Sequence, residues 1–352
     1  MPRVLMRYAV AAALVAGASL SPALATFHLM AIQEVFPGTR ANPQAQFVML
    51  RMTGSGQNFL GTNSTFLEVQ DASGAPLGRF GSFDHNLSNG GTIGCSYPSC
   101  PAVIIGTSAA QTLFGFSFDQ IVDAQAGHVA LPLAGGRLCY GYALGIVDCV
   151  AWGQFTGSNI TSTINGCDGN FGSPAAALAL DFALTRGTFN CLAAENSTDF
   201  SNGFPRPVAD SGANSNVDGD GDGLIAVLDC SDSDATSLYF PVEVAGDGVS
   251  AGTSTTVSWD SQASVTGTST RYDVVTGLVS DLLSSNSYTA ATCLQSGING
   301  LSVADPRPDP VIGEVFYYLI RAASGCGKGT FGDSSLVPDP RDALDAPTGP
   351  CP

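Results

Sequence analysis

The stretch "QFVMLRMTGSGQNFLGTNSTFLEVQDASGAP" (residues 46–76) shows the pattern that decides the fold. Two short runs of apolar or alternating residues, 46–52 and 65–71, are separated and followed by segments rich in Gly, Asn and Ser. Such runs predict β-strands, and Gly, Asn and Pro permit the backbone angles that tight turns need. The same pattern returns at residues 102–106, 137–142 and 147–155. We therefore predict a β-sandwich or barrel over residues 26–200.

One segment of this region predicts a helix. Residues 108–115 read "SAAQTLFG", with Ser108 in the position of an N-cap and Gly115 in that of a helix stop. The expected fold class of the region is therefore mostly β with one short helix.

From residue 237 onward the chain predicts strands again. The segments "PVEVAGDG", "STTVSWDS", "TRYDVVTGLVSDLL" and "VFYYLIRAAS" are separated by turns, and Trp259 can supply a core. A chain of 352 residues with 42 Gly and 20 Pro favours many short strands in two domains. We expect a second β-sandwich over residues 237–334, a polar Pro- and Gly-rich linker over residues 201–215, and an extended tail over residues 335–352.

The first 25 residues predict a secretory signal peptide. Arg3 and Arg7 precede an apolar run that is too short to span a bilayer, and the run ends in Ala23-Leu24-Ala25. We expect cleavage after Ala25 and a product that is secreted or associated with the cell surface. No later apolar stretch is long enough to predict a membrane span.

The charge balance indicates which partners to expect. The chain carries a net charge of −17, with 30 acidic and 13 basic residues, and cleavage of the signal would remove two of the basic ones. Such a surface repels nucleic acid and anionic lipid, so neither is an expected partner. Cations are the natural counterpart, and an extracellular protein or polysaccharide is a candidate ligand.

The ten cysteines predict disulfides, because their number is even and the chain is expected to be exported. Spacing alone does not fix the pairing, but near neighbours are favoured: Cys95 with Cys100, Cys139 with Cys149, and Cys167 with Cys191. Zinc is disfavoured because the chain has no CxxC motif and its three histidines are scattered.

The stretch "NVDGDGDGLIAVLDCSDSD" (residues 216–234) places six carboxylates in nineteen residues. Counted from Asp218, it fits a twelve-residue calcium loop, with a sharp turn at Gly223 and the apolar Ile225 free to pack on a core. We predict a calcium-binding acidic loop over residues 216–236. The candidate ligands are Asp218, Asp220, Asp222, the carbonyl of Leu224, Asp229, Asp232 and Asp234.

A flexible acidic spacer is the alternative interpretation of this stretch. Calcium is favoured over it, because a spacer has no reason to place Asp at each alternate position and Gly at the turn. Magnesium is less suited, since it prefers few carboxylates and retains its waters. Asp232 and Asp234 are expected to complete the calcium site or to serve a second ion.

Three parts of the chain resemble known families. The segments "IQEVFPG", "AQFVMLRMTGSGQNFLGTNSTFLEVQDASG" and "LPLAGGRLCYGY...VDCVAWGQFTG" resemble the lamin-tail-type domain of secreted bacterial proteins, over most of residues 26–210. This resemblance implies an immunoglobulin-like β-sandwich that serves as a structural or adhesive module without catalytic residues. Met49 departs from the family pattern, which usually has an acidic residue there.

The other two resemblances concern the remainder of the chain. The acidic loop, with Asp229 at position twelve and "DCSDSD" after it, is similar to the calcium loops of dockerin modules and, more closely, of thrombospondin type 3 repeats. The segments "VSWD", "YDVVTG" and "YYLIRAASGCGKGTFG" resemble a fibronectin type III domain over residues 237–334.

The sequence contains no clear catalytic constellation. The segment around Ser108 lacks the second glycine of a nucleophile elbow, and no phosphate-binding loop is present. Glu34, Glu68, Glu243 and Glu314 lie in strand-like runs, where an exposed face or a sheet edge is the default position. We therefore predict a non-enzymatic, calcium-binding structural or adhesion protein whose inter-domain joint is stiffened by calcium.

Two alternatives to this function stay open. A secreted hydrolase, for example a glycoside hydrolase with accessory β-domains, could use an acid pair that sequence spacing does not reveal. An adhesin or carbohydrate binder could work without a metal.

Overall fold

The computed structural model describes residues 27–91, 95, 97–143, 145–160, 173–187, 199–250, 252, 254–332, 339–346 and 348–351. The described residues form mostly strands with short helices, so the expected mostly β fold class is confirmed. The predicted signal peptide and the pair Cys167 and Cys191 lie outside the described residues. No helix in the described part is long and apolar enough to cross a membrane.

The N-terminal part (residues 27–203) consists of two sheets. Six strands form the first sheet in the order β10-β9-β1-β2-β5-β6: β1 (Met30–Phe36), β2 (Phe47–Met52), β5 (Ala102–Gly106), β6 (Gln120–Ile121), β9 (Ala183–Arg186) and β10 (Phe200–Gly203). Four strands form the second in the order β4-β3-β7-β8: β3 (Phe66–Asp71), β4 (Pro76–Ser82), β7 (Gly135–Tyr142) and β8 (Gly145–Gly153). Neighbouring strands are antiparallel except β5 and β6.

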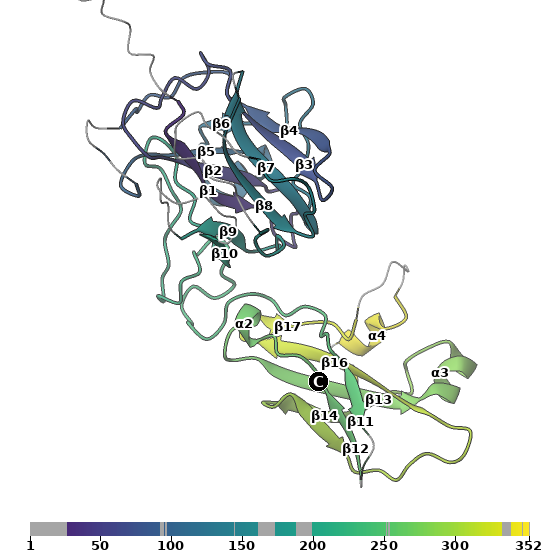
Figure 1. Cartoon of the computed structure of the whole chain (residues 1–352). Coiled ribbons are helices and arrows are strands. Elements are labelled where there is room, and N and C mark those ends of the chain that lie inside the picture. Colours follow the sequence, from purple (N-terminus) through teal and green to yellow (C-terminus); the bar gives the residue numbers. More distant parts are fainter. Residues whose placement is uncertain are drawn as a thin grey trace, which may run out of the picture.

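The two sheets face each other across one core (Figure 1). Leu50 of β2 and Val103 of β5 pack in the same cluster as Leu67 of β3 and Val150 of β8. Along β3, buried and half-buried residues alternate over most of the strand, as a sheet with one buried face requires. By contrast, β1 and β5 are buried along their whole length, so the six-stranded sheet is covered on its outer face as well.

The outer face of the six-stranded sheet is covered by a helix and by parts of the segments that were predicted to form a linker and an acidic loop. Phe47 and Ile104 on this face pack with Phe114 of α1 (Ser108–Phe114), with Ala209 and with Ile225. Residues 201–215 are therefore not a free linker: they begin within β10, and Ala209 belongs to this second core. A few apolar residues do not predict a helix or a strand, but they are enough to pack a short segment against an existing sheet.

Helix α1 confirms the predicted helix and its stop but corrects its cap. Gly115 has φ 71°, which glycine adopts without steric cost. The N-cap is Thr107, whose hydroxyl oxygen accepts a hydrogen bond from the N–H of Ala110 at 3.1 Å. Ser108 is the first helical residue, and its hydroxyl bonds instead with the carboxylate of Asp123.

We expect Thr107→Ala to destabilise the N-terminal part by about 1 kcal/mol or more, because it removes the cap of α1 and the hydrogen bonds of the same hydroxyl with Gln44 and Gln46. Ser108→Ala is the matched control and should cost less, since the exposed Ser108 does not cap the helix. Chemical denaturation of both variants measures the difference. Equal costs for the two substitutions would contradict the assignment of Thr107 as the cap.

The C-terminal part (residues 237–351) also contains two sheets. β11 (Gly248–Ser250), β12 (Thr255–Ser258) and β15 (Ser302–Asp305) form one, and β13 (Arg271–Leu278), β14 (Thr292–Ile298), β16 (Phe316–Ser324) and β17 (Gly327–Lys328) form the other in the order β14-β13-β16-β17. Val257 and Val303 of the first sheet share a core with Val274 and Ile320 of the second, and Trp259 joins them. Helix α2 (Ala263–Thr266) precedes β13 in the chain, and helix α3 (Val279–Ser285) follows it.

The C-terminal segment differs from the predicted extended tail. Its described residues include α4 (Asp342–Asp345), and Leu344 and Cys351 pack with Val275 and Phe331 against the sheet. Cys351 fastens this segment to the sheet, because it forms a disulfide with Cys293 of β14. The tail folds because it covers apolar residues on the outer face of β13 and β16.

Two of the expected near-neighbour disulfides are confirmed, Cys95–Cys100 and Cys139–Cys149. The other two in the described residues join distant segments. Cys293–Cys351 spans 58 residues and Cys230–Cys326 spans 96. The latter bond connects the acidic loop to the turn between β16 and β17.

Candidate metal centre

The acidic loop curls around the carboxylate of Asp218. Its Oδ1 accepts a hydrogen bond from the N–H of Gly221 at 2.7 Å, and its Oδ2 accepts one from Gly223 at 3.0 Å. Gly221 and Gly223 have φ values of 79° and 101°, which favour glycine over any residue with a Cβ. The sharp turn predicted at Gly223 is therefore present.

Four further aspartates follow a common pattern, in which Oδ1 accepts a backbone hydrogen bond at 2.7–3.2 Å. The donors are the N–H groups of Asp222 for Asp220, of Leu224 for Asp222, of Ser231 for Asp229, and of Gly219 for Asp232. These bonds fix each carboxylate group and leave its second oxygen for another partner. The bond from Gly219 to Asp232 also brings the two ends of the loop together.

The second oxygens of three aspartates have no such partner. The Oδ2 atoms of Asp220, Asp222 and Asp229 are inaccessible to solvent and accept no hydrogen bond. An unsatisfied carboxylate oxygen in this situation is costly, because the water it had in the unfolded chain is not replaced. A hard cation that takes six to eight oxygen ligands would satisfy all three, so the residues fit a calcium ion.

Three of the aspartates lie close together, and the charges of two more act on them. Asp218, Asp220 and Asp222 each offer an oxygen within 4.8 Å of the others, and they are the one group of this kind found within the described residues. Burial raises the pKa of Asp222, and the charges of Asp220, Asp218 and Asp232 raise it further. Burial likewise raises the pKa of Asp229, followed by the charges of Asp222, Asp220 and Asp232. The cluster is therefore built on Asp218, Asp220 and Asp222, and we add Asp229 and Asp232 as candidate ligands because they interact electrostatically with it.

Asp234 lies outside this cluster. Its Oδ1 accepts hydrogen bonds from the N–H and hydroxyl of Thr236, and its Oδ2 accepts one from Ser237 at 3.1 Å. The hydroxyl of Thr236 is the main cause that holds its pKa below the usual value. Unlike Asp218 and Asp232, Asp234 is not among the charges that act on Asp222, so we omit it from the proposed ligands. The ligand role of the Leu224 carbonyl stays a prediction, although the Leu224 side chain is fully buried.

Arg206 is a residue of this site that the sequence did not indicate. Its guanidinium donates a hydrogen bond to the carbonyl of Gly223 and lies 3.7 Å from Oδ2 of Asp218. Its backbone N–H donates to Oε1 of the buried Glu34 at 3.0 Å. A single arginine in a Pro-rich stretch carries no pattern from which this contact could be inferred.

The loop is anchored in both parts of the chain. Ile225 packs in the core on the outer face of the six-stranded sheet, as predicted for an apolar residue at position eight. Cys230, between Asp229 and Asp232, is bonded to Cys326 in the C-terminal part. A structural change in the loop would therefore act on both parts at once.

A second pair of carboxylates lies outside the loop. Burial, with a contribution from the charge of Asp210, raises the pKa of Asp119 to about 6. Asp119 accepts hydrogen bonds from the N–H groups of Ile104 and Asp210, so the pair fastens residue 210 to β5.

In comparisons with known proteins, no family model matches this chain, and no curated protein does either. The resemblances to lamin-tail, thrombospondin type 3 and fibronectin type III modules therefore stay predictions.

Proposed function

We propose that this chain is a secreted or surface-associated structural or adhesion protein, in which calcium bound by the acidic loop stiffens the joint between two β-sandwich domains. The observation that supports it most directly is the set of three inaccessible, unpartnered oxygens of Asp220, Asp222 and Asp229. A solvated acidic spacer would direct these atoms into water. The hydrolase alternative gains less support: Oδ1 of Asp210 is also inaccessible and unpartnered, but it is a single oxygen, and Asp119 and Asp210 are tied to the backbone of Ile104 and Asn89.

Calcium would act here by replacing repulsion with coordination. Without a cation, five carboxylates repel one another and oppose the compact loop. A bound cation removes this cost, and its binding free energy offsets the entropy lost when the chain is ordered. Because Ile225 is fixed to one part and Cys230 to the other, an ordered loop restricts their relative motion. Immunoglobulin-like sandwiches on both sides would then form a semi-rigid extracellular rod.

Calcium titration of the chain without residues 1–25 tests this proposal. We expect heat of binding by calorimetry and stabilisation by about 2.7 kcal/mol when calcium is about one hundred times its dissociation constant. Asp222→Asn combined with Asp229→Asn should abolish both effects and raise the stability of the calcium-free chain, because two of the repelling charges are lost. Magnesium at the same concentration should have a smaller effect.

Asp234→Asn is the matched control, since it removes a carboxylate from the same segment but outside the cluster. It should leave calcium binding unchanged. Equal loss in the control and the double variant would contradict the assigned ligands, and the lack of heat and stabilisation at millimolar calcium would refute the proposal.

The site should also bind calcium more weakly as the pH falls. The raised pKa values of Asp222 and Asp229 mean that protons compete with the cation at a higher pH than for ordinary aspartates. Calorimetry at a series of pH values measures this trend. A calcium affinity that stayed constant through the acidic range would be inconsistent with ligation by these two carboxylates.

A further inference from the structure

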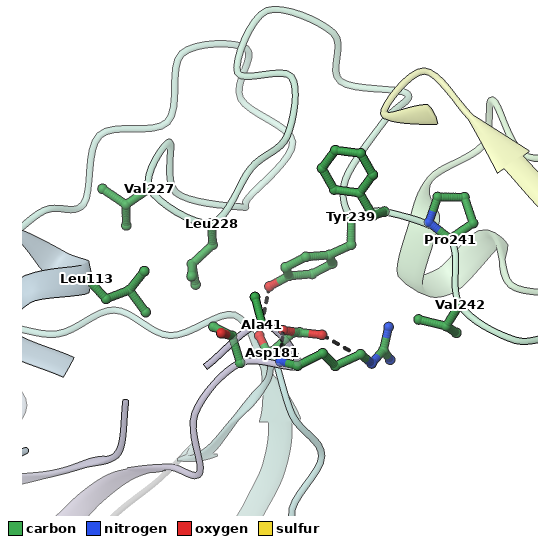
Figure 2. A pocket seen from close by; sticks show the side chains of 11 residues that line it. Ala41, Leu113, Asp181, Val227, Leu228, Tyr239, Pro241 and Val242 are labelled. Atoms are coloured by element: carbon green, nitrogen blue, oxygen red, sulfur yellow. Dashed lines mark hydrogen bonds and ion pairs between the residues drawn. The ribbon is translucent and has the colours of Figure 1, made fainter. Parts of the chain in front are cut away.

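A groove of about 460 Å³ lies where the N-terminal part, the acidic loop and the C-terminal part meet. Figure 2 shows Leu113, Val227 and Leu228 toward one side and Pro241 and Val242 toward the other, with Tyr239 between them. The lining is mainly apolar, and the groove is neither enclosed nor flat. Its size is in the range of small-ligand sites, and its open side leaves space for a longer chain to continue into solvent.

The polar end of the groove offers a cation. Nε of Arg40 lies 3.3 Å from Oδ2 of Asp181, and the backbone N–H of Arg40 donates to Oδ1 of Asp181 at 2.9 Å. The carboxylate is thus engaged on both oxygens and is only 8% exposed. The side chain of Arg40 is 38% exposed, and its two terminal nitrogens donate no hydrogen bond within the described part of the chain. The groove therefore offers a cationic donor to a ligand, while the carboxylate of Asp181 is already engaged.

The backbone holds this arrangement in place. Asp181 has φ 73°, a left-handed conformation that is uncommon for residues other than glycine. Its carbonyl accepts a hydrogen bond from the hydroxyl of Tyr239 at 2.7 Å, which ties the C-terminal part to the floor of the groove. Strained backbone of this kind persists where surrounding contacts impose it, and it is concentrated at ligand sites.

We propose that this groove binds the C-terminus of a peptide whose last side chain is apolar. The side chain would lie between Leu228 and Val242, and the terminal carboxylate would pair with the outer nitrogens of Arg40. Charge complementarity favours this occupant: in a chain with 13 basic and 30 acidic residues, an exposed guanidinium beside an apolar groove selects an anionic group. An apolar body next to one carboxylate matches both features.

Calcium should strengthen this binding, a consequence that rests on the proposed function. Val227 and Leu228 belong to the acidic loop and directly precede Asp229. The ring of Tyr239 is close enough to Asp222 and Asp229 for their charges to act on its hydroxyl. A cation on the loop would fix one wall of the groove and reduce the negative potential that a carboxylate ligand meets.

The test uses the chain without residues 1–25 and the tripeptide acetyl-Gly-Gly-Leu with a free carboxylate, followed by NMR titration in millimolar calcium. We expect a dissociation constant on the order of 1 mM. The C-terminal amide of the same peptide should bind at least about tenfold more weakly, because it loses a charge-assisted hydrogen bond. If octanoate binds more tightly than the tripeptide, the occupant is a fatty acid and the proposal is overturned. No binding of the tripeptide also overturns it.

Variants separate the groove from general effects. Arg40→Gln should weaken tripeptide binding about tenfold. Because it also releases Asp181, Leu113→Asn provides a second test that keeps the ion pair intact and should weaken binding as well. Arg271→Gln, at an exposed arginine of β13, should change nothing. Tripeptide binding that survives both groove variants would refute the site.

Calcium binding is measured separately by calorimetry, so that the two proposals can fail independently. If calcium binds but the tripeptide does not, the groove proposal fails while the proposed function stands. If the tripeptide binds and calcium does not, the proposed function fails while the groove proposal stands. If both bind, chelation should weaken tripeptide binding by about threefold or more.

Discussion

Asp148→Ala should destabilise the N-terminal part by about 3–5 kcal/mol, because it breaks a buried ion pair by removing one partner. Oδ2 of Asp148 lies 2.7 Å from Nη2 of Arg186 and also accepts a hydrogen bond from the N–H of Ile32 at 2.7 Å. Arg186 is 2% exposed. The substitution would remove one carboxylate from a guanidinium that stays charged in the core, and the cost of its desolvation is then less well compensated.

The position of this pair explains why the whole N-terminal part depends on it. Asp148 lies in β8 of the four-stranded sheet, whereas Arg186 lies in β9 of the six-stranded sheet. Nε of Arg186 also donates to the carbonyl of Ile32 in β1 at 2.9 Å. The pair thus joins the two layers across the core.

Denaturant unfolding of Asp148→Ala in a Trp259→Phe background measures the cost. In that background Trp152, which is fully buried in the N-terminal core, provides the fluorescence signal. Asp84→Ala is the control, because Asp84 is 70% exposed and its contact with His85 should be worth less than about 1 kcal/mol. A loss below about 1 kcal/mol for Asp148→Ala would show that the core tolerates removal of this ion pair.

The strands could be predicted because their signal is local. The runs at residues 46–52, 65–71 and 102–106 correspond closely to β2, β3 and β5. Alternation with period two and intervening Gly and Asn arise within a few residues, so no knowledge of partners is required. The same holds for the disulfide Cys139–Cys149, whose cysteines face each other in the pair β7 and β8.

Long-range contacts could not be predicted in this way. Cys230–Cys326 joins residues 96 apart, and residues 201–215 pack on a sheet whose outer face is invisible in the sequence. Local spacing favours disulfides between near neighbours and a linker at residues 201–215. Tertiary packing overrides the predicted linker. Glu34 illustrates the same limit, because a carboxylate in a strand is usually exposed, whereas this one is 1% exposed.

The part of the candidate site that lies within one short segment of the chain could be predicted. Alternating Asp and Gly set the positions of Asp218, Asp220 and Asp222 and the turn at Gly223. For Asp234 the pattern does not reveal that the hydroxyls of Thr236 and Ser237 bond with its oxygens, and its role as a ligand stays a prediction.

Glu34→Gln should stabilise the chain at alkaline pH by roughly 5 kcal/mol, because the wild-type carboxyl is buried and costly to ionise there. Burial is the largest cause that raises its pKa from the usual 4.5 to about 8, although the N–H of Arg206 and the charge of Arg51 act in the opposite direction. Below pH 4.5 the group is protonated in both the folded and the unfolded chain. Between pH 4.5 and 8 the folded chain retains a proton that the unfolded chain releases.

The sign of the effect follows from this proton balance. In that window the unfolded state binds fewer protons. This group therefore lowers the free energy of unfolding by about 1.4 kcal/mol for each unit by which the pH rises. Above pH 8 the loss is complete. Glutamine has similar size and can still accept the hydrogen bond from Arg206, but it does not titrate.

Denaturant unfolding of the wild type and Glu34→Gln at pH 4, 7 and 9 measures this difference. The two should be similarly stable at pH 4 and diverge as the pH rises. Glu68→Gln is the control, because Glu68 lies in β3 but is only half-buried. Glu34 accepts a hydrogen bond from Arg206, which also contacts Gly223 of the acidic loop. The calcium affinity of the two chains is therefore a second measurement, which reports whether this contact influences the loop. Parallel pH profiles for the two chains would mean that Glu34 is ionised in the folded state at neutral pH, balanced by Arg51 and Arg206.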